Sequence, residues 1–256
     1  MLLELESVSV SFGGIAALRN VSFGVPAGGI VSVIGPNGAG KTTLFNVITG
    51  FRRPSRGAVT FDGQPLAGLP PYRIARRGLV RTYQKTEVFP ELSVFDCVRI
   101  GLLNRLDAGF VEIMFGGGRV AAFVEAAPGL VRDILATVGL EHKADYAARE
   151  LSYGEQRLLE VAVGLAAQPR LLMLDEPASG LNKDESERLG ELICLLRDRG
   201  ITVLLVEHNM SLVMSVSDNI VVLHHGEKIA EDAPEAVSQD PAVVSVYLGR
   251  EWVADA

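Results

Sequence analysis

The sequence predicts an α/β fold with a mainly parallel sheet, an N-terminal antiparallel β region and a helical subdomain. In the second half of the chain, short apolar runs alternate with amphipathic helical patterns, which is typical of a parallel sheet. Near the N-terminus, strand-like segments precede and follow one helical segment. Residues 86–150 have mostly helical patterning. We therefore predict a core formed by residues 1–85 and 151–256, with a helical subdomain at residues 86–150 inserted into it.

The strands are predicted from two kinds of pattern. Residues 2–10 alternate apolar and polar side chains, as a half-exposed strand does. Residues 171–174 form a continuous apolar run, as a strand covered on both faces does. The predicted strands are residues 2–10, 17–25, 29–34, 57–61, 171–174, 201–206 and 220–223.

The helices are predicted where apolar residues recur at helical spacing. Gly50, Gly139 and Gly200 each follow such a segment, and Pro169 follows another, which are usual signals for a helix end. The predicted helices are residues 42–48, 94–106, 121–127, 130–138, 155–167 and 185–197.

Composition excludes some classes of protein. A chain of 256 residues with 48% hydrophobic residues can bury a core, and its net charge of −7 argues against a protein that coats nucleic acid. Cys97 and Cys194 are far apart in sequence, so we expect reduced thiols in a cytosolic protein. The N-terminus lacks the basic segment of a signal peptide, and no apolar run approaches about 18 residues. We expect a soluble chain, which could still dock on a membrane protein.

A phosphate-binding loop is predicted directly after the strand at residues 29–34. The sequence from Gly35 to Thr42 fits G-x-x-x-x-G-K-[ST], and a helix follows it. Glycines let the backbone wrap around an anion, and the helix N-terminus attracts phosphate oxygens. The predicted nucleotide-binding residues of this segment are Gly35, Pro36, Asn37, Gly38, Ala39, Gly40, Lys41, Thr42 and Thr43. Lys41 would reach the β- and γ-phosphates of a nucleoside triphosphate, and the Thr42 hydroxyl would bind Mg²⁺.

Two carboxylates follow the apolar run at residues 171–174. Ligands of open α/β sheets sit beyond the carboxyl ends of the strands, where the phosphate loop also lies. Asp175 is therefore predicted to hold Mg²⁺, and Glu176 to orient or deprotonate the water that attacks the γ-phosphate. An acidic loop that caps the next helix is the alternative.

A second potential anion site opens the helix at residues 155–167. Ser152 and Glu155 form a capping-box pattern, and Gly154 lies between them. A helix N-terminus with these residues can also bind an anion. One nucleotide rarely needs two such sites from distant parts of one chain.

The segment Leu151-Ser152-Tyr153-Gly154-Glu155-Gln156 resembles the signature motif of ABC-type ATPases, and further motifs match that family in order. Phe12 resembles the aromatic residue that stacks on adenine, and Gln84 the glutamine at the entrance to the helical subdomain. Asp175 and Glu176 match the second nucleotide motif, residues 179–182 the loop after it, and His208 the switch histidine. The resemblance implies a P-loop NTPase core of the ABC type, RecA-like with an antiparallel β region.

The resemblance also implies an ATPase with ATP and Mg²⁺ as cofactors. Two ATP-binding chains would pack head to tail, so that Ser152, Gly154 and Glu155 of one chain contact the ATP held by the other. Glu176, His208 and Gln84 would be catalytic, and Thr42, Gln84 and Asp175 would be metal ligands. Tyr153 departs from the commonest signature, and Asn182 replaces the aspartate of many members.

Other segments resemble the larger ATP-binding subunit of bacterial branched-chain amino-acid importers. They are residues 46–51, 81–84, 177–182 and 246–249, together with an insert near residues 104–127. This implies two transmembrane permease subunits, a homodimer or heterodimer with a second ATP-binding subunit, an indirect periplasmic binding protein, and no nucleic acid. The chain would be peripheral, on the cytoplasmic face of the inner membrane.

Several alternatives stay open at this stage. The same type of ATP-binding subunit could energise transport of urea, amides or another small solute. A non-transport soluble ABC ATPase and a nucleotide binder without turnover are further alternatives. The apolar insert around residues 110–115 could face the permease or pack on the helical subdomain. Arg73, Arg76 and Arg77 are interpreted as a solvated helix face, whereas Arg81 could belong to a docking patch.

Overall fold

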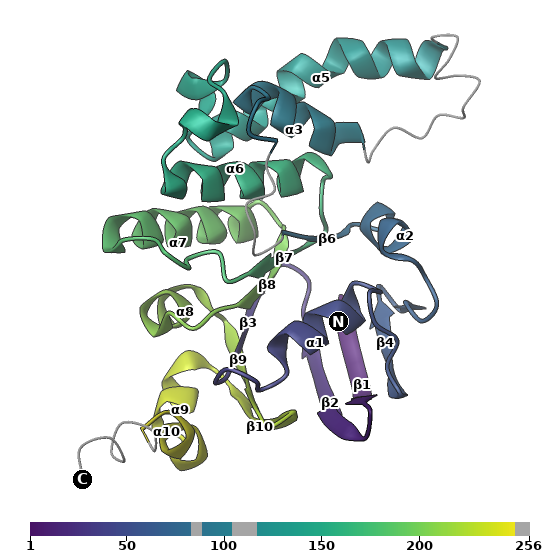
Figure 1. Ribbon diagram of the computed structural model, residues 1–256, viewed down its shortest axis with the longest axis vertical. Coiled ribbons are helices and arrows are strands. Elements are labelled where there is room, and N and C mark those ends of the chain that lie inside the picture. The colour runs from purple at the N-terminus through teal and green to yellow at the C-terminus, as the bar shows by residue number, and fades with distance from the viewer. Residues whose placement is uncertain (83–88, 104–116, 249–256) are drawn as a thin grey trace.

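The structure, a computed structural model, describes residues 1–82, 89–103 and 117–248 (Figure 1). An antiparallel sheet and a mainly parallel sheet form the core, and a layer of helices covers one end of it. The strands are β1 (Leu3–Phe12), β2 (Ile15–Val25), β3 (Ile30–Ile34), β4 (Arg56–Phe61), β5 (Gln64–Pro65), β6 (Leu79–Arg81), β7 (Leu171–Asp175), β8 (Thr202–Val206), β9 (Asn219–His224) and β10 (Glu227–Asp232). The α-helices are α1 (Lys41–Ile48), α2 (Pro71–Arg76), α3 (Val94–Leu102), α5 (Gly118–Thr137), α6 (Tyr153–Ala166), α7 (Lys183–Asp198), α8 (Met210–Val216), α9 (Pro234–Gln239) and α10 (Pro241–Leu248).

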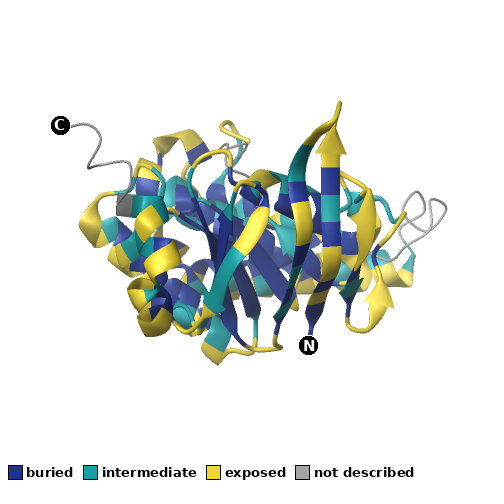
Figure 2. Ribbon diagram, turned by 90° about the horizontal axis from the view of Figure 1, so that it is seen from below, coloured by how far each residue is buried: buried dark blue, intermediate teal, exposed yellow. Residues whose placement is uncertain are grey.

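The two sheets differ in how they are covered. The antiparallel sheet has the order β2-β1-β4-β5, and β1 alternates buried and exposed residues along part of its length. The larger sheet has the order β10-β9-β3-β8-β7-β6, and all its pairs are parallel except β10 with β9. Every residue of β3, β7 and β8 is buried, which explains why these strands are mostly apolar, with Ser32, Asp175 and Thr202 as the exceptions (Figure 2).

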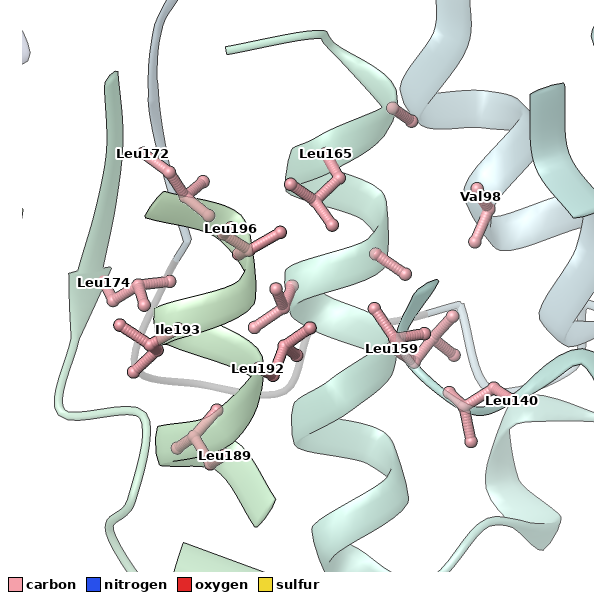
Figure 3. Close-up of a cluster of buried hydrophobic side chains, with 14 of the residues drawn as sticks. Val98, Leu140, Leu159, Leu165, Leu172, Leu174, Leu189, Leu192, Ile193 and Leu196 are labelled. Carbon is pink, nitrogen blue, oxygen red and sulfur yellow. The ribbon is translucent and has the colours of Figure 1, made fainter. Parts of the chain in front are cut away.

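Side chains on the two faces of the parallel sheet join different hydrophobic clusters. Leu172 and Leu174 of β7 pack in a cluster with residues of α3, α5, α6 and α7. Leu171 and Met173 of the same strand pack with α1 and the antiparallel sheet. Figure 3 shows the first cluster, with leucines of α6 lying beside those of α7. Helices α1 and α6 therefore lie on opposite faces of the parallel sheet.

The predicted α/β fold class is confirmed, but some elements differ from the prediction. The helices predicted at residues 121–127 and 130–138 are one helix, α5, which continues through Pro128. Strands β6 and β10 were not predicted, because β6 has only three residues and β10 is a polar edge strand. The insert residues 104–116 lie outside the described residues, as does Gln84.

The predicted domain division stays a prediction. Its second boundary falls directly before α6, and this helix packs on α3 and α5 as well as on α7. Helix α6 thus joins the two predicted parts. None of the described helices combines the length and the apolar composition needed to cross a membrane.

Candidate nucleotide-binding site

The phosphate loop, residues 35–42, connects β3 to α1 in a conformation that requires glycine at two positions. Gly35 and Gly40 have φ values of +152° and +108°. A Cβ on Gly35 would lie 2.2 Å from the carbonyl oxygen of Leu223, and one on Gly40 would lie 2.7 Å from that of Ala17. Both neighbours are backbone atoms, so they cannot move aside as a flexible side chain could. Backbone atoms of β9 and β2 therefore leave room only for glycine at these two positions of the loop.

Lys41 is a buried cation within this loop, with 7% of its surface exposed. Its Nζ donates to the carbonyl oxygens of Gly35 (2.6 Å) and Pro36 (3.2 Å). Burial lowers the pKa of the Lys41 ammonium group, and the carboxylates of Glu176 and Asp175 oppose that shift. An entering phosphate would give this cation a stronger anionic partner than two carbonyl groups.

The start of α1 is also suited to an anion. No side chain among the described residues caps this helix at Gly40, so the N–H groups of its first turn are available to a ligand. The other predicted residues surround this helix end: Asn37, Gly38 and Thr42 are exposed, Pro36 and Thr43 are half-buried, and Ala39 is buried. The exposed Thr42 hydroxyl fits the predicted role of a Mg²⁺ ligand.

Asp175, the second predicted Mg²⁺ ligand, ends β7 and pairs with Arg81 at the end of β6. Arg81 Nη2 donates to Asp175 Oδ2 at 2.6 Å, and both side chains are 7% exposed. Arg81 Nη1 also donates to Asn46 Oδ1 of α1 at 2.8 Å. This ion pair ties β6 and β7 to the helix after the phosphate loop. Because Arg81 engages one carboxylate oxygen, the other oxygen of Asp175 is the one suited to a metal ion.

The position of Arg81 corrects the sequence-based interpretation of that residue. A side chain this buried cannot belong to a docking patch, whereas Arg73, Arg76 and Arg77 are exposed, as predicted. The available signal was a lone charge directly after the apolar pair Leu79-Val80, which a buried strand tolerates only when the charge has a partner.

Glu176, the predicted general base, has a backbone conformation that is rare for a residue with a side chain. Its φ is +49°, and its N–H donates to the carbonyl oxygen of Val206 at 2.8 Å. Such backbone strain costs about 1–3 kcal/mol and is concentrated at functional sites. Since the Glu176 carboxylate acts on the pKa of Lys41, this acid lies on the same edge as the phosphate loop.

His208 follows β8, and its imidazole is largely exposed (60%). The preceding residue, Glu207, is fully buried, and its carboxylate accepts from the backbone N–H groups of Ala178 (2.7 Å), His208 (2.8 Å) and Asn209 (3.1 Å). Through these hydrogen bonds, Glu207 connects the segment after Glu176 to the turn that contains His208. Sequence reasoning did not single out Glu207, although a carboxylate directly after a buried apolar run was the available signal.

Phe12, predicted to stack on adenine, lies at the end of β1 with 46% of its surface exposed. The guanidinium of Arg52 lies 4.3 Å from the centre of its ring, within range of a cation–π contact. This contact restrains the ring while leaving it accessible to a base.

Ser152 is the N-cap of α6 and opens the second predicted anion site. Its Oγ accepts from the N–H of Glu155 at 3.3 Å, so the hydroxyl hydrogen is left to donate to an anion. Gly154 is buried, and a Cβ there would lie 2.6 Å from Glu185 Oε1. The absence of a side chain at Gly154 lets α6 approach the start of α7.

Glu155 has a role other than the predicted nucleotide contact. Its carboxylate accepts from the backbone N–H of Ser152 (2.9 Å) and from Lys143 Nζ (2.6 Å). Burial disfavours the ionised carboxylate, but these hydrogen bonds outweigh burial and lower the pKa of Glu155. An acceptor-only carboxylate with both oxygens engaged closes the capping box and offers nothing to a phosphate.

The structure therefore brings together only part of the predicted site. The phosphate loop, Asp175, Glu176 and His208 gather at the carboxyl ends of β3, β7 and β8, as expected for a ligand site of an α/β sheet. Ser152 and Gly154 begin α6 on the other face of that sheet (Figure 1). The two predicted anion sites of one chain are thus separate from each other.

An α/β core in which a phosphate loop and a strand-end acid pair share one sheet edge defines a P-loop nucleotide-binding protein. The family model described as ABC transporter matches residues 18–179, and one described as branched-chain amino acid ATP-binding cassette transporter matches residues 227–253. The chain belongs to the ABC transporter family of ATP-binding cassettes, ATPases coupled to transport.

Three comparisons extend over nearly the whole chain. The high-affinity branched-chain amino acid transport ATP-binding protein BraF of Pseudomonas aeruginosa is 41% identical over 250 residues, covering 97% of this chain and 98% of BraF. The corresponding protein LivG of Escherichia coli K12 is 42% identical over 255 residues, covering 97% and 98%. An ABC transporter cassette solved in its ADP conformation is 31% identical with a TM-score of 0.85, covering 97% and 98%. These findings confirm the predicted family, fold class and ATPase class.

Proposed function

We propose that this chain is the ATP-hydrolysing subunit of an importer for branched-chain or related hydrophobic amino acids. The observation that carries the hydrolytic part is the acid pair at the end of β7, whose charges act on buried Lys41 of the phosphate loop. The substrate class is supported by similarity to BraF and LivG, together with the match at residues 227–253.

Each residue at the sheet edge has a defined task in this proposal. The phosphate loop and Lys41 bind the β- and γ-phosphates, and Phe12 stacks on the adenine. Mg²⁺, when bound by Thr42 and Asp175, with Gln84 as the third predicted ligand, offsets phosphate charge. Glu176 orients the attacking water and takes its proton, while His208 contacts the γ-phosphate. Glu207 and Arg81 hold the segments that carry these groups.

Two ATP-binding chains are needed to complete each site. The start of α6 lies on the face of the parallel sheet opposite to α1, which supports a role toward the nucleotide held by another chain. In the proposed head-to-tail pair, Ser152 and Gly154 of one chain contact the γ-phosphate bound by the other. The second chain is either another copy or a similar ATP-binding subunit.

The membrane assignment is part of the same proposal. Importers of this kind place two transmembrane permease subunits against the ATP-binding chains, and a periplasmic binding protein delivers the solute to the permeases. The chain would then be a peripheral subunit on the cytoplasmic face of the inner membrane. ATP-driven closure of the pair, followed by hydrolysis, would move the permeases between their states.

The substitution Glu176→Gln tests the hydrolytic assignment. We expect Mg-ATP affinity to stay unchanged and hydrolysis to slow by roughly 10²- to 10⁴-fold, because a positioned general base contributes about that much. Glu187→Gln, which neutralises an exposed carboxylate of α7, is the matched control and should retain wild-type turnover. Near wild-type hydrolysis by Glu176→Gln would remove Glu176 from this role.

Co-purification tests the transport assignment. We expect the chain to be recovered with membrane permeases, and its ATPase rate to rise when the binding protein carries a branched-chain amino acid. Stimulation by urea or an amide instead would transfer the same mechanism to another solute. Recovery of ribosomes or DNA would contradict a role in transport.

A further inference from the structure

Tyr153 is the residue of the signature segment (residues 151–156) that departs from the commonest family pattern, and the proposed function gives it no role. Tyr153 lies at the start of α6 with 44% of its surface exposed. Its hydroxyl donates to the carbonyl oxygen of Ser179 at 3.0 Å. Ser179 belongs to the 179–182 loop, which follows the acid pair and leads into α7. Tyr153 thus connects two segments that are 26 residues apart in sequence.

A buried arginine determines which group donates in the hydrogen bond between Tyr153 and Ser179. Arg157 Nη2 donates to the Tyr153 hydroxyl at 2.7 Å, so the hydroxyl hydrogen is left to donate to Ser179. Arg157 is buried (4% exposed), and its Nη1 donates to Glu160 at 2.9 Å. The Arg157 guanidinium also lies 5.1 Å from the centre of the Tyr153 ring. A charged donor on the hydroxyl oxygen strengthens the bond that the hydroxyl itself donates.

The 179–182 loop is shaped to receive the Tyr153 ring. Gly180 has a φ of +80°, and a Cβ there would lie 2.9 Å from Tyr153 Cε1. The loop ends at Asn182, the N-cap of α7, whose side chain accepts from the N–H of Glu185 at 3.0 Å. Glu185 is also the residue against which Gly154 packs. The signature segment therefore touches the loop through Tyr153, and it touches the first turn of the following helix α7 through Gly154.

We propose that Tyr153 couples the signature segment to the 179–182 loop, so that the two form one rigid surface for a second ATP-binding chain. This inference rests on the paired-chain arrangement proposed above. The partner is a chain of the same kind with nucleotide in its phosphate loop, because Ser152 offers that chain's nucleotide a hydroxyl donor. Tyr153 is a positioning residue: its hydroxyl is occupied within its own chain, and it acts by fixing the geometry of its neighbours.

Tyr153→Phe tests the coupling, because it removes the hydroxyl and keeps the ring. Tyr146→Phe removes the hydroxyl of another exposed tyrosine (50%, against 44% for Tyr153) and serves as the control. Hydrogen exchange is measured on peptides that cover the 179–182 loop, the phosphate loop and the middle of α6. We expect at least threefold faster exchange in the 179–182 loop of Tyr153→Phe alone, with the other peptides unchanged. Unchanged exchange in this loop would overturn the proposal.

The same substitution is then made in a Glu176→Gln background, and ATP-driven dimer formation is measured by sedimentation. We expect the dimer dissociation constant to rise by roughly 5- to 100-fold, because one hydrogen bond is affected at each of two sites. Mg-ADP affinity, which depends on the phosphate loop of one chain, should not change. Faster loop exchange with an unchanged dimer dissociation constant would overturn the proposal that Tyr153 affects binding of the second chain.

Failure of the proposed pairing would look different from failure of the coupling. If Glu176→Gln with intact Tyr153 stays monomeric in saturating ATP, pairing of identical chains is wrong. Hydrogen exchange then decides the coupling on its own, with the outcomes given above. If the Glu176→Gln dimer forms and Tyr153→Phe changes neither measurement, only the coupling is wrong.

Discussion

The two predicted anion sites of this molecule, the phosphate-loop end (residues 35–42 with Asp175) and the signature end (residues 151–156), hold their polar and charged groups in different ways. At the phosphate loop, Lys41 and Asp175 are buried and have partners within the chain. At the signature end, Ser152 and Tyr153 are exposed, and the helix start is already closed by the capping box of Ser152 and Glu155. The charged groups of the first end are fixed by partners within the chain, and the second end is an exposed surface whose own polar groups are largely satisfied.

In the proposed paired-chain arrangement, the contrast explains how one chain can fold by itself and still need a second chain to complete its nucleotide site. Buried charges need fixed partners, because an unpaired buried ion is costly, so the phosphate-loop end must form with the fold. An exposed capped helix start needs no ligand for stability, so the signature end can be formed before a second chain binds. Substitutions should therefore act mainly on folding at the first end and mainly on pairing at the second.

Arg81→Met should have the largest effect on stability, since it leaves the Asp175 carboxylate buried without its partner. We expect the free energy of unfolding to fall by about 3–5 kcal/mol, measured by urea denaturation. The matched control is Arg170→Met, which breaks an exposed ion pair with Asp62 whose side chains are 52% and 57% exposed. The control should cost about 0–1 kcal/mol.

A double variant keeps this prediction testable if Arg81→Met folds poorly. Adding Asp175→Asn removes the orphaned charge, so most of the lost stability should return. Equal losses for Arg81→Met and Arg170→Met would show that burial of the first pair is not what matters at the phosphate-loop end.

Ser152→Gly should act on pairing rather than on folding. Glycine at an N-cap costs only a few tenths of a kcal/mol, so α6 should stay formed while the hydroxyl donor is lost. In a Glu176→Gln background, we expect the ATP-driven dimer to weaken by roughly tenfold or more per site, because hydrogen bonds to charged groups are the stronger ones. Sedimentation measures the dimer, and nucleotide titration of the single chain should show no change.

Ser93→Gly is the control for this substitution, because Ser93 caps α3 in the same way by accepting from the N–H of Asp96 at 3.0 Å. It should cost similar stability without weakening the dimer. Loss of nucleotide affinity in the monomeric Ser152→Gly chain would place Ser152 in its own chain's site and break the contrast between the two ends.

The sequence predicted the positions of the phosphate loop after β3 and of the acids at the end of β7, because both consist of adjacent residues with a local pattern, and their roles stay predictions. It could not show the partners of buried charges, because Arg81 and Asp175 are 94 positions apart and meet only through the pairing of β6 with β7. Glu207 was missed for the same reason: the N–H group of Ala178 that it accepts from lies 29 positions away. Continuous α5 was predicted as two helices because Pro128 and Gly129 are ordinary helix breakers, and packing of its buried residues overrides them.

Substitution of Glu155 gives the smallest predicted effect, and it tests whether groups of the same chain stabilise the signature end. Its pKa in the folded state is lowered, so its ionised form stabilises the fold at pH values above the unfolded value of about 4.5. That contribution is lost as the pH falls through the lowered value in the folded state.

Because the Lys143–Glu155 pair is partly exposed (23% for each side chain), we expect Glu155→Gln to cost at most about 1 kcal/mol at pH 7. Urea unfolding of both proteins from pH 7 to pH 3 should show the difference shrinking below about pH 4.5. Lys143→Met should reduce the same pH dependence by removing the main partner, and a Glu155→Gln effect independent of pH would show that the carboxylate charge does not stabilise this helix start.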